Sequence, residues 1–316
     1  MKYHSKLKKK FPHGIMFHHF HDKKKHKKIQ GTIDKNQLIK IIKFIGRENI
    51  LDAETFLENF EKKKLKKNHV CFTFDDCNPS QYDVAIPVLE KYKIKAFFFI
   101  ITSPYDGKYE KTELFRFFRF TFFHSINNFY KKFYNYISSD YLNFLKKKNK
   151  TILFRKQTYP HYSYEDIKFR LIRDEFLKMN EYDQIMFQMF KDFKFDPKQY
   201  VKKIFISKKH IRDIQKKGHS IGLHSHNHPT YINSLSDKQQ LKEYKTNRIT
   251  LSKILNKSFF FFKSMSHPCG RYNQVTLKIL EKLGIQIGFI ERMTRSKKNY
   301  KFKVPRQDHS EIISMF

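Results

Sequence analysis

Short runs of apolar residues alternate along most of the chain with stretches in which apolar positions recur every three or four residues. The short runs are rich in Phe, Ile and Val, and apolar runs of this length favour β-strands. The sequence therefore predicts strands at residues 13–20, 69–74, 95–102, 220–224, 258–263 and 285–290.

The intervening stretches carry the three- and four-residue spacing of amphipathic helices. They predict helices at residues 37–44, 80–92, 207–217, 236–256 and 273–283. Side chains suited to capping begin three of them, at Ser207, Ser236 and Asn273. Strands that alternate with helices of this length predict an α/β fold with a largely parallel sheet, open or closed into a barrel.

One region interrupts the alternation. From about residue 104 to residue 200 the chain is crowded with Phe, Tyr and Lys, and no strand pattern stands out. We interpret this region as a helical insertion in a single domain that spans residues 1–316. Interleaved aromatic and basic residues can bind single-stranded nucleic acid. Buried helix faces with solvated lysines give the same pattern, and the absence of an RNP-like or zinc-finger motif favours them over a nucleic-acid partner.

The charge balance is strongly basic, with 65 Lys and Arg against 30 Asp and Glu and a formal net charge of +35. Such a charge suits nucleic acid, peripheral contact with an anionic membrane surface, or a phosphate-bearing substrate. The residue bias of an AT-rich genome accounts for the excess of Lys over Arg. It does not account for the scarcity of acidic residues, so attraction to an anionic surface or substrate stays open.

The cysteine count and the N-terminal pattern bear on location. Three cysteines, an odd number, do not fit a disulfide-stapled secreted scaffold. The basic N-terminus leads into residues 11–14 without the apolar run of a signal peptide, and no later stretch approaches membrane-spanning length. We therefore expect a soluble, cytoplasmic protein.

Two adjacent carboxylates, Asp75 and Asp76, end the predicted strand at residues 69–74. In parallel α/β folds the carboxyl ends of the strands converge on the active site, so acidic residues there are placed for chemistry. Successive side chains of a strand point in opposite directions, which lets the two carboxylates take different roles. The alternative is structural, because both can cap the predicted helix that begins near Ser80.

Three histidines, His224, His226 and His228, lie close together after another predicted strand. His224 and His228 are four residues apart, a spacing that puts both rings on one face of a helical turn and suits a metal that prefers nitrogen ligands. With a carboxylate from a distant strand they would form a site with open positions for water and substrate. The alternative is a chance cluster, because another group of histidines occurs at residues 18–21.

Three segments together resemble motifs of a known family. Thr73-Phe74-Asp75-Asp76 is similar to the first motif of the NodB-homology polysaccharide deacetylases, carbohydrate esterase family four, and His224-Ser225-x-x-His228-Pro229 to the second. Their third motif, usually Arg-x-Pro-Tyr-Gly, resembles Ser266-His267-Pro268-Cys269-Gly270. The resemblance extends from about residue 13 to residue 308 apart from the insertion. It implies a distorted (β/α) barrel with the site at the carboxyl ends of the strands.

The resemblance also implies a division of roles around one divalent ion, with zinc as the expected metal. Asp76, His224 and His228 would hold the ion. Asp75 would act as the general base, since a carboxylate beside a metal-activated water can take its proton.

Substrate binding and proton donation fall to the third motif and to a late histidine. By the resemblance, the backbone N–H at Cys269, with Gly270 beside it, would bind the acetyl group and stabilise the oxyanion. The family supplies the leaving nitrogen with a proton from a late histidine. We take His267 as the candidate, with His309 and His19 as alternatives.

The chain departs from the family pattern in three places. Cys77 replaces the usual glycine and can offer a soft fourth ligand, although nothing else resembles a thiolate site. Ser266 replaces the arginine that orients the catalytic aspartate. Arg306, in a late strand-like segment, can take its place; the alternative is a surface salt bridge from Arg306 to Asp308. The family's tryptophan-bearing groove needs a Phe or Tyr here, because the chain has no Trp.

The sequence therefore predicts a hydrolase that removes an N-acetyl group from an amino sugar of a polysaccharide or of its nucleotide- or lipid-linked precursor. Two alternatives remain. One is a catalytically inactive NodB-like binding protein in polysaccharide assembly, which has lost the motif arginine. The other is a basic nucleic-acid-binding protein that uses the aromatic insertion.

Overall fold

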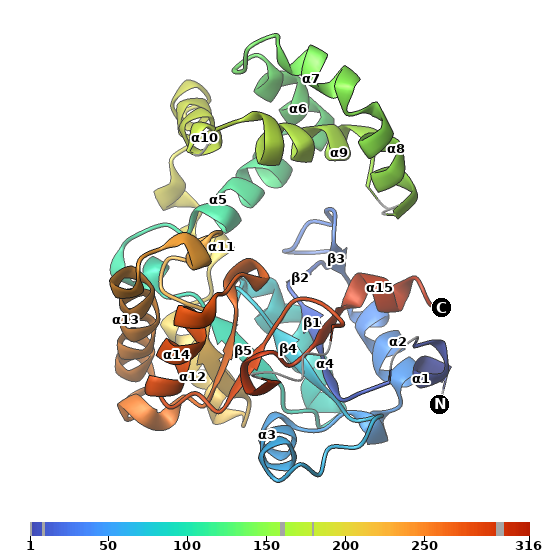
Figure 1. Ribbon diagram of the computed structural model, residues 1–316, viewed down its shortest axis with the longest axis vertical. Coiled ribbons are helices and arrows are strands. Elements are labelled where there is room, and N and C mark those ends of the chain that lie inside the picture. The colour runs from blue at the N-terminus through green and yellow to red at the C-terminus, as the bar shows by residue number, and fades with distance from the viewer. Residues whose placement is uncertain (1, 8–9, 159–161, 179, 295–299) are drawn as a thin grey trace. The chain divides into compact units, whose positions relative to one another are not determined.

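The computed structural model describes residues 2–7, 10–158, 162–178, 180–294 and 300–316. Its contacts divide the chain into two units. The first unit comprises Met1–Glu110 and Val201–Phe316, and the second comprises Lys111–Tyr200. The first contains a parallel sheet flanked by helices, and the second is built from helices (Figure 1).

Among the described residues, seven parallel strands form the sheet of the first unit, in the order β8-β7-β6-β5-β4-β1-β9. Phe289, the last residue of β8, forms a parallel bridge with Val304, which lies two residues before β9 begins. The two edges of the sheet therefore nearly meet, and the fold is a distorted (β/α) barrel, which confirms the predicted fold class. The strands are β1 (His13–Phe17), β4 (Val70–Phe74), β5 (Phe97–Ile100), β6 (Ser220–Leu223), β7 (Ser264–Ser266), β8 (Ile287–Phe289) and β9 (Arg306–Asp308). A short parallel pair, β2 (His19–Phe20) and β3 (Thr32–Ile33), lies outside this sheet.

The core of the barrel is aromatic. Every residue of β1, β4 and β5 is buried, as expected for parallel strands covered on both faces. The rings of Phe74 and Phe98 stack at 4.6 Å, and Phe17 stacks on Phe74 at 5.0 Å. Offset ring pairs of this kind stabilise a core beyond the area they bury, by about 0.5–1.5 kcal/mol each.

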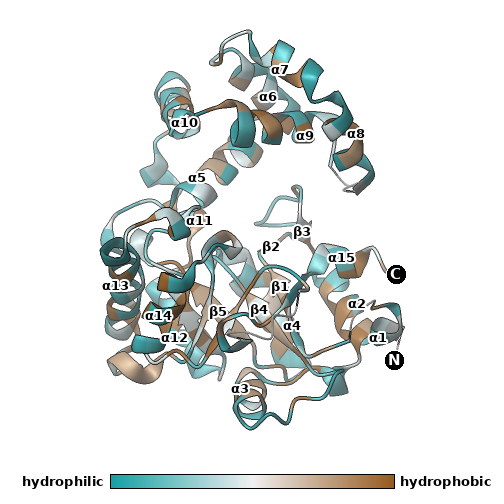
Figure 2. Cartoon of the chain, viewed as in Figure 1, coloured by the Kyte–Doolittle hydropathy of each residue, from teal (hydrophilic) through white to brown (hydrophobic). Residues whose placement is uncertain are grey.

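Helices cover the sheet with apolar faces, and Figure 2 shows hydrophobic residues concentrated along the strands and on α2. In α2 the buried residues Leu38, Ile41, Ile42 and Ile45 recur at helical spacing, which explains why this segment packs as a helix. Helices of the first unit are α1 (Lys2–Lys6), α2 (Lys35–Ile45), α3 (Ala53–Glu61), α4 (Ile86–Lys91), α11 (Val201–Ile204), α12 (Lys208–Lys216), α13 (Asp237–Leu255), α14 (Gln274–Lys282) and α15 (His309–Ile313).

One predicted strand is wrong. Residues 259–261 form a 3-10 helix, and the strand is β7, which begins at Ser264. The apolar run before it instead surrounds the buried Arg248 of α13. The Arg248 guanidinium lies 4.8 Å from the centre of the Phe259 ring and donates a hydrogen bond of 2.8 Å to the Phe262 carbonyl. The aromatic residues of this run therefore pack around the buried Arg248 guanidinium. The strand β7 is formed by the smaller residues that follow, from Ser264 to Ser266.

Aromatic side chains also form the core of the second unit. Phe118 is buried and contacts the rings of Phe129, Phe190 and Phe195. These rings pack on one another and are therefore not available to stack on bases. The helices are α5 (Lys111–Phe117), α6 (Ile126–Tyr134), α7 (Tyr141–Lys147), α8 (Asn149–Thr158), α9 (Tyr164–Leu171) and α10 (Glu181–Asp192). Throughout the described part of the chain, none of the helices combines the length and the apolar character needed to span a bilayer.

Candidate active site

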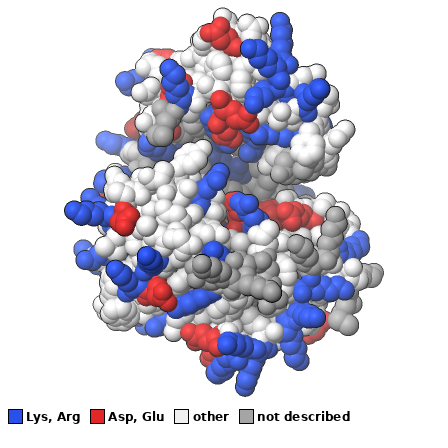
Figure 3. Space-filling model, viewed as in Figure 1, with Lys and Arg blue, Asp and Glu red and all other residues white. Residues whose placement is uncertain are grey.

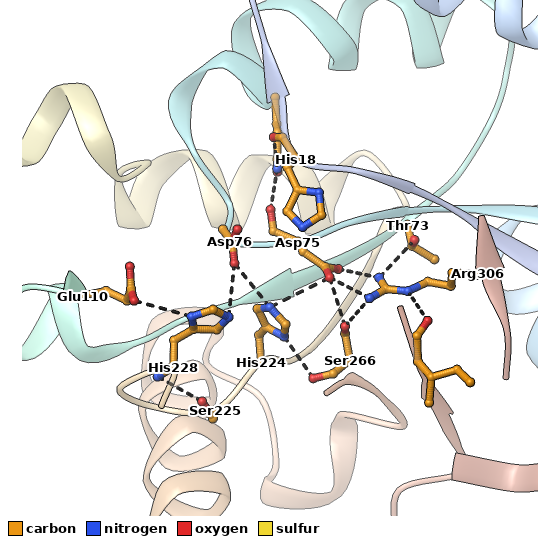
Figure 4. Close-up of polar contacts among 12 residues, drawn as sticks. His18, Thr73, Asp75, Asp76, Glu110, His224, Ser225, His228, Ser266 and Arg306 are labelled. Atoms are coloured by element: carbon orange, nitrogen blue, oxygen red, sulfur yellow. Dashed lines mark hydrogen bonds and ion pairs between the residues drawn. The ribbon is translucent and has the colours of Figure 1, made fainter. Parts of the chain in front are cut away.

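The structure brings Asp76, His224 and His228 together at the carboxyl ends of two strands (Figure 4). Asp76 follows β4, and the two histidines follow β6. Asp76 Oδ1 lies 3.3 Å from His224 Nε2 and 3.7 Å from His228 Nε2. The three potential ligand atoms all lie within 4.8 Å of one another, and all three side chains are buried. One ion can therefore contact all three residues.

The chemistry of Asp76 fits a divalent cation. Its Oδ1 is buried and has no hydrogen-bond partner in the described structure. Burial would raise the pKa of this carboxyl, but the His224 and His228 imidazoles lower it well below its usual range. A buried, ionised oxygen without a partner costs free energy unless a cation contacts it. Two imidazole nitrogens and one carboxylate oxygen form a donor set that zinc accepts.

Cys77 does not belong to this group of ligands. The cluster of potential metal ligands contains Asp76, His224 and His228 without it. Burial and the neighbouring Asp76 carboxylate raise the pKa of the Cys77 thiol far above its usual value. Nothing in the geometry supports it as a fourth ligand.

Near the cluster, the backbone adopts conformations that are unfavourable for most residues other than glycine. Asp76, Ser225 and His228 all have positive φ angles, of 70°, 63° and 51°, which lie in the left-handed region. Such conformations cost free energy and concentrate at functional sites. The expected helical turn between His224 and His228 is therefore wrong. A tight loop brings their rings to 4.8 Å, and a hydrogen bond from His228 N to Ser225 Oγ stabilises it.

Asp75 lies beside the cluster and is bound by Arg306. Arg306 donates to both oxygens of Asp75, with Nη1–Oδ1 and Nη2–Oδ2 distances of 2.7 and 2.8 Å. Its side chain is 1% exposed, so the alternative of a surface salt bridge to Asp308 is wrong. Burial would raise the pKa of Asp75, but the charge of Arg306 and, more weakly, that of His224 lower it. Asp75 is therefore ionised at neutral pH.

Gly14 makes room for this arginine. It lies on β1 between β9, which carries Arg306, and β4, which leads to Asp75. A Cβ at Gly14 would lie 3.0 Å from Arg306 Cγ and 3.2 Å from Thr73 Cγ2. The side chain of Arg306 therefore crosses β1 in a space that only glycine leaves open.

Ser266, at the position of the usual motif arginine, connects Asp75 to His224. Its hydroxyl donates to Asp75 Oδ2 at 3.0 Å and accepts from Arg306 Nη2 at 2.8 Å. Its backbone carbonyl lies 2.9 Å from His224 Nδ1. Because a carbonyl only accepts, Nδ1 donates to it, and Nε2 is the nitrogen of His224 that faces Asp76 and could bind a metal.

The histidine candidates for proton donation occupy different surroundings. His267 is buried and its Nε2 donates to the Phe302 carbonyl at 2.9 Å; burial lowers its pKa to about 4. His309 is buried beside Asp308, with 3.7 Å between Nδ1 and the carboxylate, and its Nε2 has no hydrogen-bond partner among the described residues. His19 is partly exposed and its Nδ1 contacts the Asn78 amide. The assignment of His267, like the alternatives His309 and His19, stays a prediction.

The predicted oxyanion segment lies in the loop after β7. Cys269 adopts φ 49° and ψ 26°, inside a short 3-10 turn at Pro268–Gly270. Gly270 also has a positive φ, and a Cβ there would meet the side chain of Glu291 at 2.4 Å. Their role in binding substrate stays a prediction.

Sequence reasoning missed two residues beside the cluster. His18 follows β1 and lies next to Asp75 and Asp76 in Figure 4. The signal was present, because a histidine at a strand's carboxyl end lies at the edge where the aspartates lie. Glu110 is 1% exposed, and its Oε1 lies 3.4 Å from His228 Nδ1. It belongs to no motif and falls in the stretch interpreted as insertion, so no sequence pattern indicates its role.

A cluster of two histidines and one carboxylate, beside an arginine-bound aspartate at the mouth of a parallel barrel, can support metal-assisted hydrolysis. The polysaccharide deacetylase family model matches residues 62–288. The chain therefore belongs to the polysaccharide deacetylase family, which confirms the resemblance. Membership supports a hydrolase that deacetylates polysaccharide and implies an N-acetylated sugar as substrate.

Solved structures share the fold at low sequence identity. The Streptococcus pyogenes deacetylase PplD, in complex with acetate, superposes with a TM-score of 0.56 at 17% identity, over 97% of each chain. IcaB from Ammonifex degensii gives 0.56 at 13% identity, again over 97% of each chain. A de-N-acetylase from Aggregatibacter actinomycetemcomitans gives 0.55 at 14% identity, over 96% of this chain and 99% of that one. A search of curated protein sequences finds no significant match.

Proposed function

We propose that this protein is a metal-dependent hydrolase that removes the N-acetyl group from an amino sugar of a polysaccharide or of its carrier-linked precursor. The observation that carries the proposal is the buried cluster of Asp76, His224 and His228, with the orphaned Asp76 Oδ1 at its centre. These residues would hold one divalent ion, with zinc as the metal that the donor set suits. When bound, that ion would supply a Lewis acid that polarises the acetyl carbonyl and activates water.

Asp75 is placed to act as the base. Its Oδ2 lies 3.9 Å from His224 Nε2, so it borders the ligand cluster. Arg306 and Ser266 fix the carboxylate and keep it ionised, ready to take a proton from the attacking water. The water oxygen forms a new bond to the acetyl carbon, the C–N bond breaks, and an imidazole returns a proton to the amine. Acetate and the free amino sugar are the products.

The alternative function, a catalytically inactive binding protein, rests on the loss of the motif arginine. Arg306 supplies a guanidinium to the same aspartate from β9. The base is therefore oriented without the motif residue, and that argument against catalysis no longer holds.

We further propose that the substrate carries an anionic group, as a nucleotide- or lipid-linked sugar does. Lys and Arg outnumber acidic residues on the face shown in Figure 3, in keeping with the formal charge of +35. This charge would attract phosphates and would also favour peripheral contact with an anionic membrane surface. Cys71 and Cys77 are free thiols, as a reducing cytoplasm would keep them, and we propose that location.

The proposal is tested with purified, metal-loaded protein and a panel of N-acetylated nucleotide sugars and oligosaccharides, with free acetate as the readout. We expect acetate release from at least one substrate class, and its loss in Asp75→Asn and after chelation of the metal. Full activity of metal-free protein, or of Asp75→Asn, would contradict the proposed mechanism.

A further inference from the structure

Glu110 and Asp76 contact opposite nitrogens of the His228 ring. Asp76 Oδ1 lies 3.7 Å from Nε2, and Glu110 Oε1 lies 3.4 Å from Nδ1. All three side chains are buried, and that of Glu110 is 1% exposed. At this separation the carboxylate charge acts strongly on the ring, because little water screens the pair.

The segment that carries Glu110 is bound to the loop that carries His228. The backbone N–H groups of Thr102 and Ser103 both donate to the His226 carbonyl, at 3.3 and 2.9 Å. The Thr102 hydroxyl also contacts His226 Nδ1 at 3.0 Å. The chain then reverses at Gly107, whose φ is 76°, and reaches Glu110. The contact of Glu110 with His228 therefore joins two loops that are already hydrogen-bonded to each other.

We propose that Glu110 is a positioning residue that fixes His228 as a metal ligand. Its carboxylate holds the proton on Nδ1, so that the lone pair of Nε2 points at the cluster and gains basicity. Carboxylates that contact the second nitrogen of a ligating histidine act in this way, and their loss weakens metal binding about 10- to 100-fold. This role rests on the metal site of the proposed function.

The two ligand histidines are then held by different groups. His224 Nδ1 faces the neutral carbonyl of Ser266, whereas His228 Nδ1 faces a charged carboxylate. A charged partner places more negative charge on its ring than a carbonyl does. The affinity of the site for metal therefore depends more on Glu110 than on the Ser266 carbonyl.

The same loops contain a matched control. Asp106 Oδ2 lies 3.7 Å from Nε2 of His226, a second carboxylate–imidazole pair. His226 is not part of the ligand cluster, and the Asp106 side chain is 44% exposed. Asp106→Asn therefore removes a similar charge at a similar distance from a histidine that holds no metal.

The test is competition for Zn²⁺ between the metal-free protein and a chromophoric chelator. We expect Glu110→Gln to bind Zn²⁺ about 10- to 100-fold more weakly than the wild type, and Asp106→Asn to bind it as the wild type does. Binding of Glu110→Gln within twofold of the wild type would overturn the proposal. Failure of the wild type to bind Zn²⁺ would instead overturn the metal site itself, so the two failures are distinguishable.

A second measurement needs no variant and covers the case in which Glu110→Gln does not fold. The ¹⁵N chemical shifts of the neutral imidazoles in the metal-free wild type report which nitrogen carries the proton. We expect His228 to carry it on Nδ1. A proton on Nε2 would overturn the proposal.

Discussion

Arg306 on β9 binds Asp75 at the end of β4 through two hydrogen bonds, between residues that are 231 positions apart in the sequence. The guanidinium crosses β1 over Gly14 to reach the carboxylate. The family places its orienting arginine in the third motif, where this chain has Ser266. The positive charge that keeps Asp75 ionised is therefore present, although it comes from another strand.

Replacing Arg306 by Gln should change the pH dependence of catalysis. Arg306 lowers the pKa of Asp75, so its loss raises that pKa and moves the acidic limb of kcat/KM to higher pH. Loss of one partner from a buried ion pair should also reduce the free energy of unfolding by about 3–5 kcal/mol. Measurement of pH–rate profiles and of urea unfolding checks both effects.

Arg306→Lys is the matched variant, since it keeps the charge but loses the two-point contact. It should shift the acidic limb less than Arg306→Gln does. The folded-state pKa of Asp75 lies below its unfolded value. The ion pair therefore stabilises the wild type at pH above that unfolded value, about 4, and this contribution is lost as the pH falls. An acidic limb that does not move in Arg306→Gln would contradict the assignment of Asp75 as base.

Gly14→Ala tests the same pair without removing a functional group. The added methyl would press on Arg306 Cγ at 3.0 Å and Thr73 Cγ2 at 3.2 Å, so the arginine has to shift. We expect kcat to fall about tenfold or more, because small displacements of positioning groups are costly to catalysis. Zinc affinity should stay unchanged, since Gly14 touches no ligand. A loss of zinc affinity as large as the loss of kcat would show that the substitution distorts β1 itself.

Ser266→Ala separates the two contacts of Ser266. It removes the hydroxyl that binds Asp75 and Arg306 but keeps the carbonyl that accepts from His224 Nδ1. A lost hydrogen bond of about 1–1.5 kcal/mol predicts a five- to tenfold lower kcat. The zinc dissociation constant should not change. Ser264→Ala, on the same strand, removes a buried hydroxyl that has no hydrogen-bond partner in the described structure and should leave kcat unaltered.

Much of the barrel and of the ligand set could be predicted because the signals are local. Asp76 and His224 each follow an apolar strand, and strand ends converge in a parallel barrel. The sequence left two partners open for Arg306, Asp75 and Asp308, because a contact between distant strands leaves no local sequence pattern. Glu110 could not be predicted, since its position depends on how two loops pack. The prediction of a strand at residues 258–263 was wrong because an apolar run can form a strand or can pack its rings around a buried arginine, and the sequence pattern is the same in both cases.

Zinc should stabilise the folded protein through Asp76, His224 and His228. A ligand that binds only the folded state stabilises it by about 2.7 kcal/mol at 100 times its Kd. We therefore expect added Zn²⁺ to raise the melting temperature of the wild type and to leave that of Asp76→Ala unchanged. Glu58→Gln, an exposed carboxylate on α3, is the control and should respond as the wild type does. A similar rise in Asp76→Ala would place the zinc elsewhere.

The proton donor can be assigned by comparing His309→Ala with His267→Ala at saturating metal. Burial lowers the pKa of His267 to about 4, so its ring is neutral near pH 7, and the one proton it carries is already bound to the Phe302 carbonyl. Burial lowers the pKa of His309 as well, although the adjacent Asp308 charge favours the protonated ring; its Nε2 has no hydrogen-bond partner among the described residues. Loss of a general acid lowers kcat about 10²- to 10⁴-fold. We expect a fall of that size for His309→Ala and a much smaller one for His267→Ala. The reverse order would restore His267 as the donor, and a large loss in both would require His18, beside the two aspartates, to be tested in the same assay.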